Sequence, residues 1–428
     1  MKSVHFIGIG GTGLSAIARI LVERGYTVSG SDRVLSPLAR ELAELGVRVV
    51  EGHSPRNIAG ADLVIRSSAI PDDNPEVQAA LAAGIPVMKR SDFLKELLAG
   101  SDCLAVAGTH GKTTTTSMLV WALTRLLYDP SYIIGGVPHD LGKNAHAGQF
   151  PLFVIEADEY DHMFLGLSPR WAVVTIVEHD HPDCFPTPED YQAAFVTFTH
   201  KIVPGGQLFI CQDDPGAVAL AASAPSGVHT FTYGTDLKAN YSARDLVTNP
   251  LGGTNFTFWF GAAGASPDLL THVRLQVPGE HNVRNAAAVL AVTHQMRIPP
   301  KQVAVALSKF TGTGRRFDLR GIAAGVIIIN DYAHHPTEIR TTLAAARQRY
   351  PDHRIWAVWQ PHTYSRTQAL IEAFAAAFRD ADQVIVTEVY AAREHNTTFS
   401  SLQVVQRMDH ASARFQRSGG TRNASWHL

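Results

Sequence analysis

The sequence predicts an α/β protein of three domains. Short apolar segments alternate with amphipathic helical segments over the first 100 residues, which is typical of a doubly wound parallel sheet. A phosphate-binding loop then opens a second strand-to-helix unit at Cys103, and a third alternation of strands and helices begins near Gly312. We therefore expect domains at residues 1–100, 101–312 and 313–428.

Composition narrows the class of protein. The 428 residues are 45% hydrophobic and 18% charged, with a net charge of −2. This describes an ordinary globular protein and argues against nonspecific binding to nucleic acid or membrane surfaces. The three cysteines are far apart and odd in number, which fits a reducing compartment better than a disulfide framework. Met1 leads directly into a strand, and no apolar stretch is long enough to span a bilayer, so we expect a cytoplasmic protein.

In the first segment, strands and helices follow one another closely. A strand at Val4–Ile9 runs through a glycine turn into a helix at Leu14–Arg24, and a second strand (Tyr26–Gly30) precedes a second helix (Ser36–Glu44). Further short strands are expected at Val47–Val50, Leu63–Arg66 and Pro86–Met88.

The first glycine turn reads G-I-G-G-T-G, which is the dinucleotide-binding pattern. Asp32 lies at the end of the second strand, where an acidic residue binds a ribose hydroxyl. A glycine turn at a helix N-terminus accepts any pyrophosphate, however. The pattern therefore fits NAD(P), the diphosphate of a UDP-sugar, or a purely structural turn. The candidate residues are Gly8, Gly10, Gly11, Thr12, Gly13 and Asp32.

The second segment opens with the most informative motif of the chain. A predicted strand at Cys103–Ala107 leads into G-T-H-G-K-T-T-T-T and then into an apolar helix at Met118–Leu127. Backbone N–H groups, the helix dipole and Lys112 would face phosphate groups, and a threonine hydroxyl can reach Mg²⁺. Only Thr109 and His110 separate the glycines, whereas the standard loop has four residues there. The alternative is a glycine turn with a surface lysine.

Two acidic clusters follow predicted strands of the same segment. The strand Phe153–Ile155 ends in E-A-D-E-Y-D, and the strand Ala172–Val177 ends in E-H-D-H. The carboxyl ends of parallel strands meet at one edge of a sheet, and clustered carboxylates are costly without a cation. We expect two divalent ions bridging ATP phosphates, with Glu156, a threonine hydroxyl and His181 as ligands. Solvated loop charges are the alternative.

The rest of the second segment changes character along the chain. A buried strand is expected at Gln207–Ile210, and alternating threonine and aromatic residues around Phe231–Tyr233 and Asn255–Phe260 predict antiparallel strands. The motif H-N-V-R-N precedes a helix expected at Ala286–Val292.

The third segment predicts a small parallel sheet of three strands, at Val326–Asn330, Ile355–Gln360 and Gln383–Glu388. Helices are expected at Thr337–Gln348 and Thr367–Phe378. The motifs N-D-Y-A-H-H-P and Q-P-H-T-Y-S-R each follow a strand. From about residue 408 onward the sequence favours neither strand nor helix, and we expect an irregular tail.

Together these motifs resemble the Mur ligase family, the ATP-dependent amide ligases of peptidoglycan precursor synthesis. The shortened loop G-T-H-G-K-T-T, Glu156, Asp180-His181, the pattern H-N-x-x-N, Arg316 and Asp331 occur in the family's order, and the resemblance extends to about residue 394. It implies an N-terminal Rossmann-like UDP-binding domain, a central P-loop ATPase-type domain, and a C-terminal Rossmann-like domain that is incomplete here.

The resemblance also implies roles for single residues. The implied catalytic residues are Lys112, Glu156 and His181, and the implied ligands of Mg²⁺, or of Mn²⁺ in its place, are Thr113, Glu156 and His181. The implied ATP-binding residues are Gly108, Thr109, His110, Gly111, Lys112, Thr113, Thr114, Asn282, Asn285, Arg316 and Asp331. Ser67 and Ser68 would line the UDP-sugar site beside the glycine turn, and His335, His362 and Arg366 the amino-acid side of the cleft.

Within the family, the opening H-F-I-G-I-G-G-T-G and the two histidine motifs of the third segment are most similar to the member that adds L-alanine. The implied reaction joins L-alanine to the lactyl carboxylate of UDP-N-acetylmuramate through an acyl phosphate made from ATP. No lysine occurs between Lys143 and Lys201, so the carbamylated lysine of several sister ligases has no candidate, as expected of this member. Ile176 departs from the family, which commonly has asparagine there.

Three alternatives remain open at this point. The E-A-D-E-Y-D run also resembles the family member that recycles murein peptides by attaching them to UDP-N-acetylmuramate. An NAD-dependent oxidoreductase would use the first glycine turn alone. A non-catalytic UDP-sugar-binding protein would result if the third domain fails to close.

Overall fold

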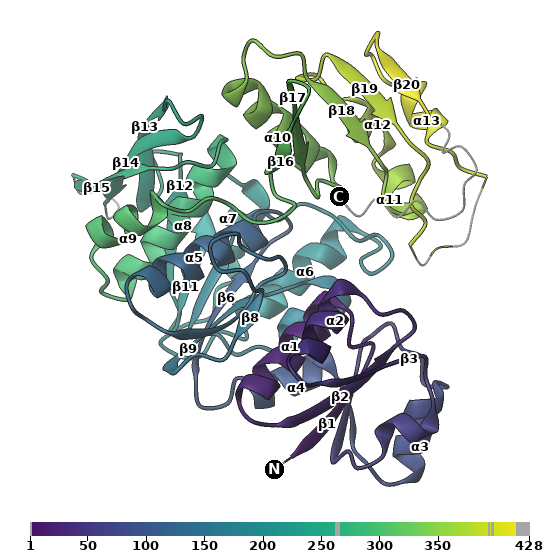
Figure 1. Ribbon diagram of the computed structural model, residues 1–428. Helices are drawn as coiled ribbons and strands as arrows, with labels where there is room; N and C mark the ends of the chain where they lie inside the picture. The colour runs from purple at the N-terminus through teal and green to yellow at the C-terminus, as the bar shows by residue number, and fades with distance from the viewer. Residues whose placement is uncertain (1, 262–265, 393, 395–397, 417–428) are drawn as a thin grey trace.

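The computed structural model describes residues 2–261, 266–392, 394 and 398–416, and it forms three α/β domains that follow one another along the chain (Figure 1). The central domain lies between the other two, with the N-terminal domain on one side and the C-terminal domain on the other. The predicted three-domain α/β fold is therefore confirmed.

The N-terminal domain is a five-stranded parallel sheet in the order β3-β2-β1-β4-β5. Its strands are β1 (Ser3–Ile7), β2 (Thr27–Asp32), β3 (Arg48–Glu51), β4 (Leu63–Arg66) and β5 (Val87–Lys89). Its helices are α1 (Thr12–Glu23), α2 (Pro37–Glu44), the 3₁₀ helix η1 (Pro55–Ile58), α3 (Pro75–Ala82) and α4 (Arg90–Leu97). The strand order reverses between β1 and β4, so the glycine turn after β1 and the loop after β4 flank the switch point where such sheets bind ligands.

The central domain contains a ten-stranded sheet in the order β15-β14-β13-β12-β11-β10-β6-β9-β7-β8. Its strands are β6 (Asp102–Ala107), β7 (Pro130–Ile133), β8 (Ala145–His146), β9 (Phe150–Glu156), β10 (Trp171–Val174), β11 (Gln207–Cys211), β12 (His229–Gly234), β13 (Tyr241–Thr248), β14 (Thr254–Phe260) and β15 (Asp268–Arg274). Its helices are α5 (Lys112–Arg125), η2 (Tyr160–Gly166), α6 (Pro188–Thr199), α7 (Pro215–Ala219), η3 (Leu220–Ser223), α8 (Glu280–Gln295) and α9 (Pro300–Leu307).

The antiparallel strands of the central domain lie at one edge of the sheet. The prediction is right for Asn255–Phe260, because β14 pairs antiparallel with β13 and β15. It is wrong for Phe231–Tyr233, because β12 runs parallel to β11. Alternation of threonine and aromatic residues reports a half-buried strand, whatever the direction of its neighbours.

Helix α8 anchors the core of the central domain. It contacts α5, α9 and several strands, and most of its residues are buried. The small side chains of Ala286, Ala287 and Ala288 are fully buried and permit close packing. The N-termini of α5 and α8 are thereby held at the same edge of the sheet, next to the phosphate loop.

The C-terminal domain differs from its prediction in two ways. Its strands are β16 (Asp318–Ala323), β17 (Val326–Asn330), β18 (Trp356–Trp359), β19 (Gln383–Val386) and β20 (Ala413–Phe415). Its helices are α10 (Pro336–Arg349), α11 (Tyr364–Ala369), α12 (Ile371–Ala375) and α13 (Leu402–Val405). The predicted strand Val326–Asn330 is not part of a parallel sheet, because β17 forms an antiparallel hairpin with β16. The turn between β16 and β17 places Ala324 and Gly325 at positive φ, which allows a tight hairpin. Strand β17 therefore pairs with the adjacent strand β16 and not with a strand farther along the chain.

The second difference concerns the tail. The prediction of no strand after about residue 408 is wrong for β20, which pairs in parallel with β19 and completes a three-stranded sheet with β18. A three-residue strand has too few residues to show periodicity, and pairing with β19 alone decides its conformation. The remainder of the predicted irregular tail, residues 417–428, lies outside the described residues.

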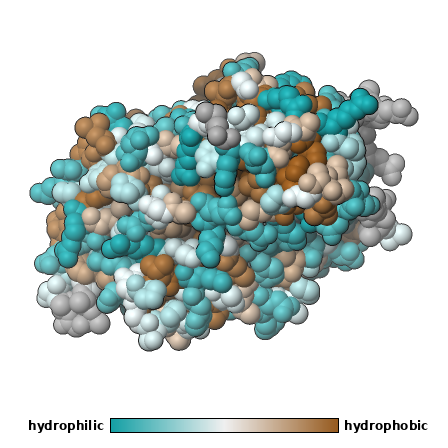
Figure 2. All heavy atoms as spheres, turned by 90° about the horizontal axis from the view of Figure 1, so that it is seen from below, coloured by the Kyte–Doolittle hydropathy of each residue, from teal (hydrophilic) through white to brown (hydrophobic). Residues whose placement is uncertain are grey.

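The molecular surface is mixed in character. On the face shown in Figure 2, hydrophilic side chains predominate and apolar side chains lie in groups between them. Within the part of the chain that the structure describes, no helix combines the length and apolar character needed to cross a bilayer.

Candidate active site

A cavity of about 460 Å³ lies between the central and C-terminal domains. Its wall brings together most of the predicted ATP-binding residues: His110, Gly111, Thr113, Thr114, Asn282, Asn285, Arg316 and Asp331. Gly108, Thr109 and Lys112 belong to the same phosphate loop but not to the cavity wall. The phosphate loop and the start of α8 lie at one edge of the sheet, and the third domain faces that edge. Residues about 200 positions apart in the chain therefore meet at one site.

The shortened phosphate loop depends on its two glycines. Gly108 has a φ of 132° and Gly111 a φ of 82°, both in the region that favours glycine. A Cβ atom would lie 2.0 Å from the hydroxyl of Thr175 at Gly108, and 2.7 Å from the amide oxygen of Asn285 at Gly111. Thr175 also donates to the carbonyl oxygen of His110 at 2.5 Å. The side chains of Thr175 and Asn285 therefore pack against the two glycines and leave no room for a Cβ atom at either position.

Lys112 is held by acidic groups at the start of α5. Its Nζ donates to the carbonyl oxygen of Gly108 at 2.5 Å and to Oε2 of Glu159 at 2.7 Å. Burial lowers the pKa of Lys112, but Glu159 and Asp158 outweigh burial and raise it above its ordinary value. The hydroxyl of Tyr191 donates to the other oxygen of Glu159 at 3.0 Å. The lysine is therefore charged and fixed close to the helix N-terminus.

Glu156 and Thr113 offer hard oxygen donors beside the lysine. The Thr113 hydroxyl donates to Oε1 of Glu156 at 2.8 Å, and the N–H of Gly135 donates to Oε2 at 2.6 Å. Burial raises the pKa of Glu156 although Lys112 opposes the shift, so the ionised carboxylate lacks full compensation. The carboxylate of Glu156 and the hydroxyl of Thr113 offer oxygen ligands that fit a divalent cation such as Mg²⁺.

His181 lies on the other side of Glu159. Its Nε2 is 3.7 Å from Oε1 of Glu159, and its backbone has a φ of 56°. Glu159 therefore lies between Lys112 and His181 and was not among the residues predicted for the site. The E-A-D-E-Y-D run contained the only signal, since it places four carboxylates after one strand.

The second acidic cluster occupies a loop, because β10 ends at Val174 and not at Val177 as predicted. Asp180 binds Arg366 of the C-terminal domain, which donates from Nε at 2.6 Å and from Nη2 at 3.3 Å. Both side chains are buried. Burial would raise the pKa of Asp180, but His334, His181 and Arg366 hold it well below its ordinary value.

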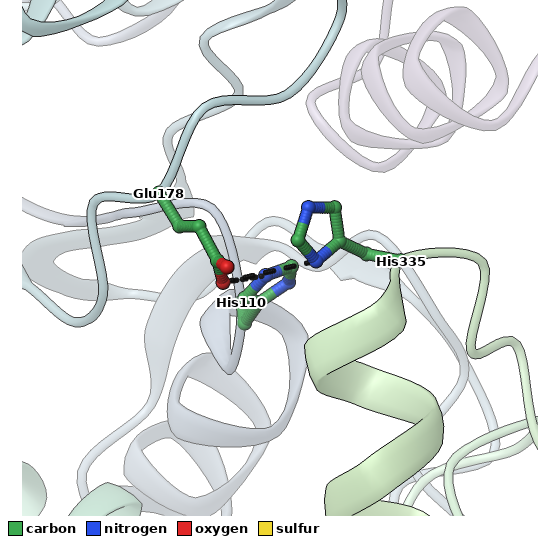
Figure 3. Close-up of side chains that lie close together, drawn as sticks. All are labelled: His110, Glu178 and His335. Carbon is green, nitrogen blue, oxygen red and sulfur yellow. Dashed lines mark hydrogen bonds and ion pairs between the residues drawn. The ribbon is translucent and has the colours of Figure 1, made fainter. Parts of the chain in front are cut away.

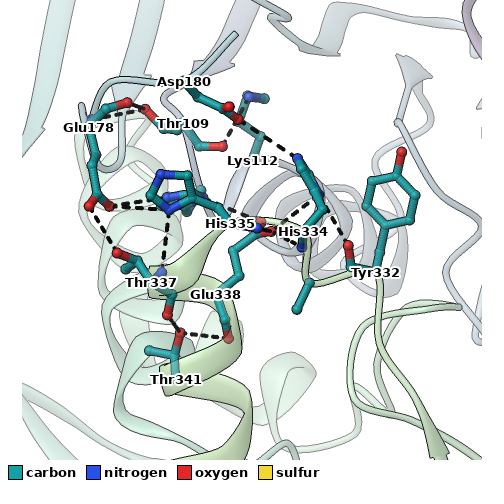
Figure 4. Close-up of polar contacts among 12 residues, drawn as sticks. Thr109, Lys112, Glu178, Asp180, Tyr332, His334, His335, Thr337, Glu338 and Thr341 are labelled. Carbon is teal, nitrogen blue, oxygen red and sulfur yellow. Dashed lines mark hydrogen bonds and ion pairs between the residues drawn. The ribbon is translucent and has the colours of Figure 1, made fainter. Parts of the chain in front are cut away.

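His110 of the phosphate loop lies between the carboxylates of Glu178 and Glu338. Figure 4 shows these two carboxylates with the polar contacts around them. Nε2 of His110 lies 3.3 Å from Glu178, and its Nδ1 lies 3.3 Å from Glu338. Burial lowers the pKa of His110, but Glu178 and Glu338 raise it to about 9. Burial acts to raise the pKa of Glu178, but His110, His335 and Thr337 outweigh burial and lower this pKa to about 2.

The C-terminal domain supplies the opposite wall of the cavity. Arg316 pairs with Glu338 at 3.3 Å and lies 5.3 Å from the ring centroid of Tyr332. The carboxylate of Asp331 accepts backbone N–H groups of Phe317 and Ala333 at 2.7 and 2.8 Å, which ties the start of the third domain to the segment that precedes α10. Burial raises the pKa of Asp331 despite the nearby Arg316.

The histidines of this domain that were predicted for the amino-acid side lie on different elements. His335 caps α10 and its ring centroid is 4.6 Å from that of His110. His362 precedes α11 and accepts a hydrogen bond from Nη1 of Arg366 at 3.1 Å. Burial lowers the pKa of both His335 and His362 to about 4, helped by the positive charge of His110 and Arg366 respectively.

Glu338, Thr337 and His334 were also missed by sequence reasoning. His334 belongs to the motif N-D-Y-A-H-H-P, and Thr337 and Glu338 follow it. Glu338 occupies the third position of α10, where its carboxylate accepts the backbone N–H groups of His334 and His335 at 3.0 and 3.3 Å. The sequence H-P-T-E is a helix-start signal, and this local role hid the contact of Glu338 with His110.

The predicted UDP-sugar residues gather at the carboxyl ends of β1, β2 and β4. Gly8 has a φ of 86°, and a Cβ there would lie 3.2 Å from Cβ of Ser67. The carboxylate of Asp32 accepts the N–H of Gly10 at 2.8 Å and therefore braces the glycine turn. Gly11 is exposed at the start of α1, and Ser68 is exposed beside Ser67. Thr12 and Gly13 form the first residues of α1, and the guanidinium of Arg90 lies against Gly13.

Known proteins match this chain along nearly its whole length. The Mur ligase family catalytic domain matches residues 3–101, the Mur ligase middle domain residues 106–293, and the Mur ligase glutamate ligase domain residues 315–419. A UDP-N-acetylmuramate–L-alanine ligase from Frankia casuarinae is 43% identical over 447 residues, covering 97% of this chain and 88% of that protein. A ligase of the same name from a Roseiflexus species is 44% identical over 405 residues, covering 91% and 85%.

Solved structures also match this chain along nearly its whole length. The UDP-N-acetylmuramate-alanine ligase MurC from Thermotoga maritima has a TM-score of 0.81 at 28% identity, covering 98% of this chain and 91% of that one. A murein peptide ligase from Psychrobacter arcticus has a TM-score of 0.74 at 27% identity, covering 98% and 91%. The three-domain architecture is thus shared with these proteins, and this chain belongs to the Mur ligase family.

Proposed function

We propose that this chain is an ATP-dependent ligase that joins L-alanine to the lactyl carboxylate of UDP-N-acetylmuramate in the synthesis of peptidoglycan precursors. The observation that carries the proposal is one cavity lined by the phosphate loop, the start of α8 and the third domain, with the two acidic clusters in contact with that loop and with Arg366 of the third domain. The relatives that align along at least 91% of the chain are named for this activity. The proposed substrates, a nucleotide-linked sugar and ATP, place the reaction in the cytoplasm.

ATP occupies the cavity between the central and third domains. The N-terminus of α5 and Lys112 face its phosphates, as anions bind at helix N-termini. Asn282 and Asn285 lie at the start of α8 and contact the adenine, while Arg316 and Asp331 reach the nucleotide from the hinge and the third domain. Lys112 leaves Glu159 when it moves to the phosphates.

Thr113 and Glu156 are proposed to hold one Mg²⁺, and His181 a second, because their oxygen and imidazole donors lie beside the lysine. When bound, the metal neutralises charge on the phosphates and on the transferring phosphoryl group. The remaining steps depend on positioning by the chain's own residues.

The lactyl carboxylate attacks the γ-phosphorus in line and releases ADP, which leaves an acyl phosphate. The amine of alanine then attacks the activated carbonyl and expels phosphate. Lys112 stabilises the charge that develops on the phosphoryl oxygens, and the closed domain arrangement excludes water that would hydrolyse the acyl phosphate. His335 and His362, whose pKa values near 4 leave them unprotonated at neutral pH, are the candidate acceptors of the amine proton.

The test is phosphate release by the full chain with ATP, Mg²⁺ and UDP-N-acetylmuramate, comparing L-alanine with L-alanyl-γ-D-glutamyl-meso-diaminopimelate. Release with alanine alone supports the proposal. Release with the tripeptide alone assigns the chain to murein-peptide recycling. Quenching of tryptophan fluorescence by NAD(H) at the concentrations that saturate a dinucleotide enzyme would contradict the assignment of the first glycine turn to UDP.

A further inference from the structure

Three side chains that commonly bind metal ions meet at the contact between the central and third domains. His110 comes from the phosphate loop, Glu178 from the loop after β10, and His335 from the residue before α10 (Figure 3). One ligand atom from each lies within 4.8 Å of the others. Both histidines are buried, with exposed fractions of 7% and 2%. The cluster is separate from Thr113 and Glu156 and was not predicted from the sequence.

The spacing of the three ligand atoms fits a small tetrahedral ion. Nε2 of His110 is 3.3 Å and Nδ1 of His335 is 3.7 Å from Oε2 of Glu178. Ligand atoms that each lie about 2.0 Å from a tetrahedral zinc ion are about 3.3 Å apart. Oε2 of Glu178 therefore already has this spacing from Nε2 of His110, and His335 must move closer to complete the geometry.

The groups behind the ligands have the arrangement that supports metal binding. Nδ1 of His110 faces Glu338 at 3.3 Å, which forms a carboxylate–histidine pair of the kind that orients metal ligands. The hydroxyl of Thr337 donates to Oε1 of Glu178 at 2.9 Å and fixes that carboxylate. Nδ1 of His335 accepts the backbone N–H of Thr337 at 3.3 Å, so this nitrogen is unprotonated, and a metal ion bound there takes the place of this capping hydrogen bond.

The cluster borders the nucleotide cavity. His110, Thr337 and Glu338 line that cavity, and the side chain of Glu178 is 40% exposed. A water molecule or a phosphate oxygen can therefore reach the site. Two imidazoles and one carboxylate favour a borderline transition-metal ion over Mg²⁺, which prefers oxygen ligands.

We propose that His110, Glu178 and His335 bind one divalent transition-metal ion, with zinc the best match, and that this ion clamps the third domain onto the central domain. Two ligands belong to the central domain and one to the third domain, so the ion joins the domains only when they are closed. Because each catalytic cycle must open the cavity to release ADP, bound zinc inhibits turnover.

The test measures zinc binding to the full chain, without substrates and with excess Mg²⁺, by competition with a chromogenic zinc indicator. We expect one zinc ion per chain that Mg²⁺ does not displace, and strong visible absorption when Co²⁺ replaces zinc, as tetrahedral cobalt shows. Glu178→Gln and His335→Gln should each weaken zinc binding by more than about 100-fold. Thr337→Val removes the supporting hydrogen bond to Glu178, together with the one that the Thr337 hydroxyl accepts from Arg340, and should weaken zinc binding by about 10- to 100-fold.

Two matched variants serve as controls. His353→Gln changes an exposed histidine of the third domain, and His181→Gln changes the histidine of the proposed Mg²⁺ site; both should bind zinc as the unmodified chain does. Zinc should also raise the melting temperature of the unmodified chain but not of Glu178→Gln. Equal zinc affinity in Glu178→Gln and the unmodified chain, or loss of zinc in His181→Gln alone, would overturn the proposal. If His335→Gln does not fold, Glu178→Gln decides the question, since it changes only the central domain.

Discussion

Lys112 shows how one residue of the site depends on its neighbours before any ligand binds. Its ammonium group is nearly buried and pairs with Glu159, whose side chain is 1% exposed. Removing one member of a buried ion pair leaves the other charge uncompensated, at a cost of about 3–5 kcal/mol. A variant of Lys112 therefore tests two properties, ATP turnover and stability, which must be separated.

We predict that Lys112→Ala abolishes phosphate release from ATP and leaves UDP-sugar binding intact, because Lys112 is not part of the glycine turn of the N-terminal domain and the substitution leaves the contacts of that turn in place. Isothermal titration with UDP-N-acetylmuramate and a phosphate assay check the two parts. The double variant Lys112→Ala/Glu159→Gln should regain the lost stability without regaining ATP turnover. Loss of UDP-sugar binding in a folded variant would show that the ATP site is misplaced.

Glu76 is the corresponding buried charge of the N-terminal domain. Burial acts to raise its pKa, but His5, Ser31 and Asn57 donate or share hydrogen bonds with its carboxylate and lower the pKa from 4.5 to about 2. Asn57 donates at 2.6 Å and Ser31 at 2.5 Å. The carboxylate thereby ties α3 to β1, β2 and η1.

A carboxylate with a lowered pKa stabilises the fold above its unfolded pKa, and this contribution is lost as the pH falls through the folded pKa. For Glu76 the window runs from about pH 4.5 down to about 2, and the shift corresponds to about 3 kcal/mol. Urea unfolding followed by circular dichroism should show Glu76→Gln less stable at pH 7, with the gap narrowing below pH 5. Glu41→Gln, at an exposed pair with Arg19, should change little at any pH. A gap that stays constant with pH would contradict the assignment.

At the scale of elements, two neighbouring glycines of the first glycine turn carry different steric constraints. Gly10 is enclosed, since a Cβ would lie 2.8 Å from the hydroxyl of Ser36 and 2.9 Å from the carboxylate of Asp32. Gly11 is open: the nearest atom to a Cβ there is the carbonyl oxygen of Gly8 at 3.5 Å. Substitution at Gly10 therefore disturbs the fold, whereas substitution at Gly11 changes only what can approach the turn.

We predict that Gly11→Val weakens UDP-sugar binding and leaves both the melting temperature and ATP binding unchanged, because the valine side chain occupies the approach to the helix N-terminus. Titration with UDP-N-acetylmuramate and with ATP measures the two affinities. Gly10→Ala provides the contrast and should lower the melting temperature. An unchanged UDP-sugar affinity in Gly11→Val would remove this turn from the binding site.

Most elements of the first two domains were predictable because apolar periodicity and glycine turns are local signals. Strand directions at β12 and β17 were not, since pairing partners decide direction and the sequence pattern of a strand is the same in both. The helix predicted at Thr367–Phe378 is interrupted at Leu370, where the backbone leaves helical geometry between α11 and α12.

At the scale of the whole molecule, the third domain is docked by a buried ion pair between Arg366 and Asp180, with side-chain exposures of 4% and 3%. Its geometry is bidentate, which gives direction as well as attraction. His334 approaches the same carboxylate at 3.8 Å. The closed arrangement therefore depends on a few polar contacts that join the two domains.

We predict that Asp180→Asn loosens this docking, because the buried Arg366 then lacks a full counter-charge. Small-angle X-ray scattering should show a larger radius of gyration for the variant than for the unmodified chain. Asp382→Asn breaks the exposed pair with Arg347 inside the third domain and should leave the radius unchanged. Identical scattering of Asp180→Asn and the unmodified chain would mean that other contacts hold the domains together.

The sequence by itself determined the α/β class, the three domains, the two glycine turns and the acidic cluster at the end of β9, because each depends on residues close together in the chain. Only the tertiary structure decided that His110 lies between Glu178 and Glu338, and that Glu159 holds Lys112. These pairs join segments that are tens to hundreds of residues apart, so no local pattern encodes them. Their charges become compatible with burial only when folding brings opposite charges into contact.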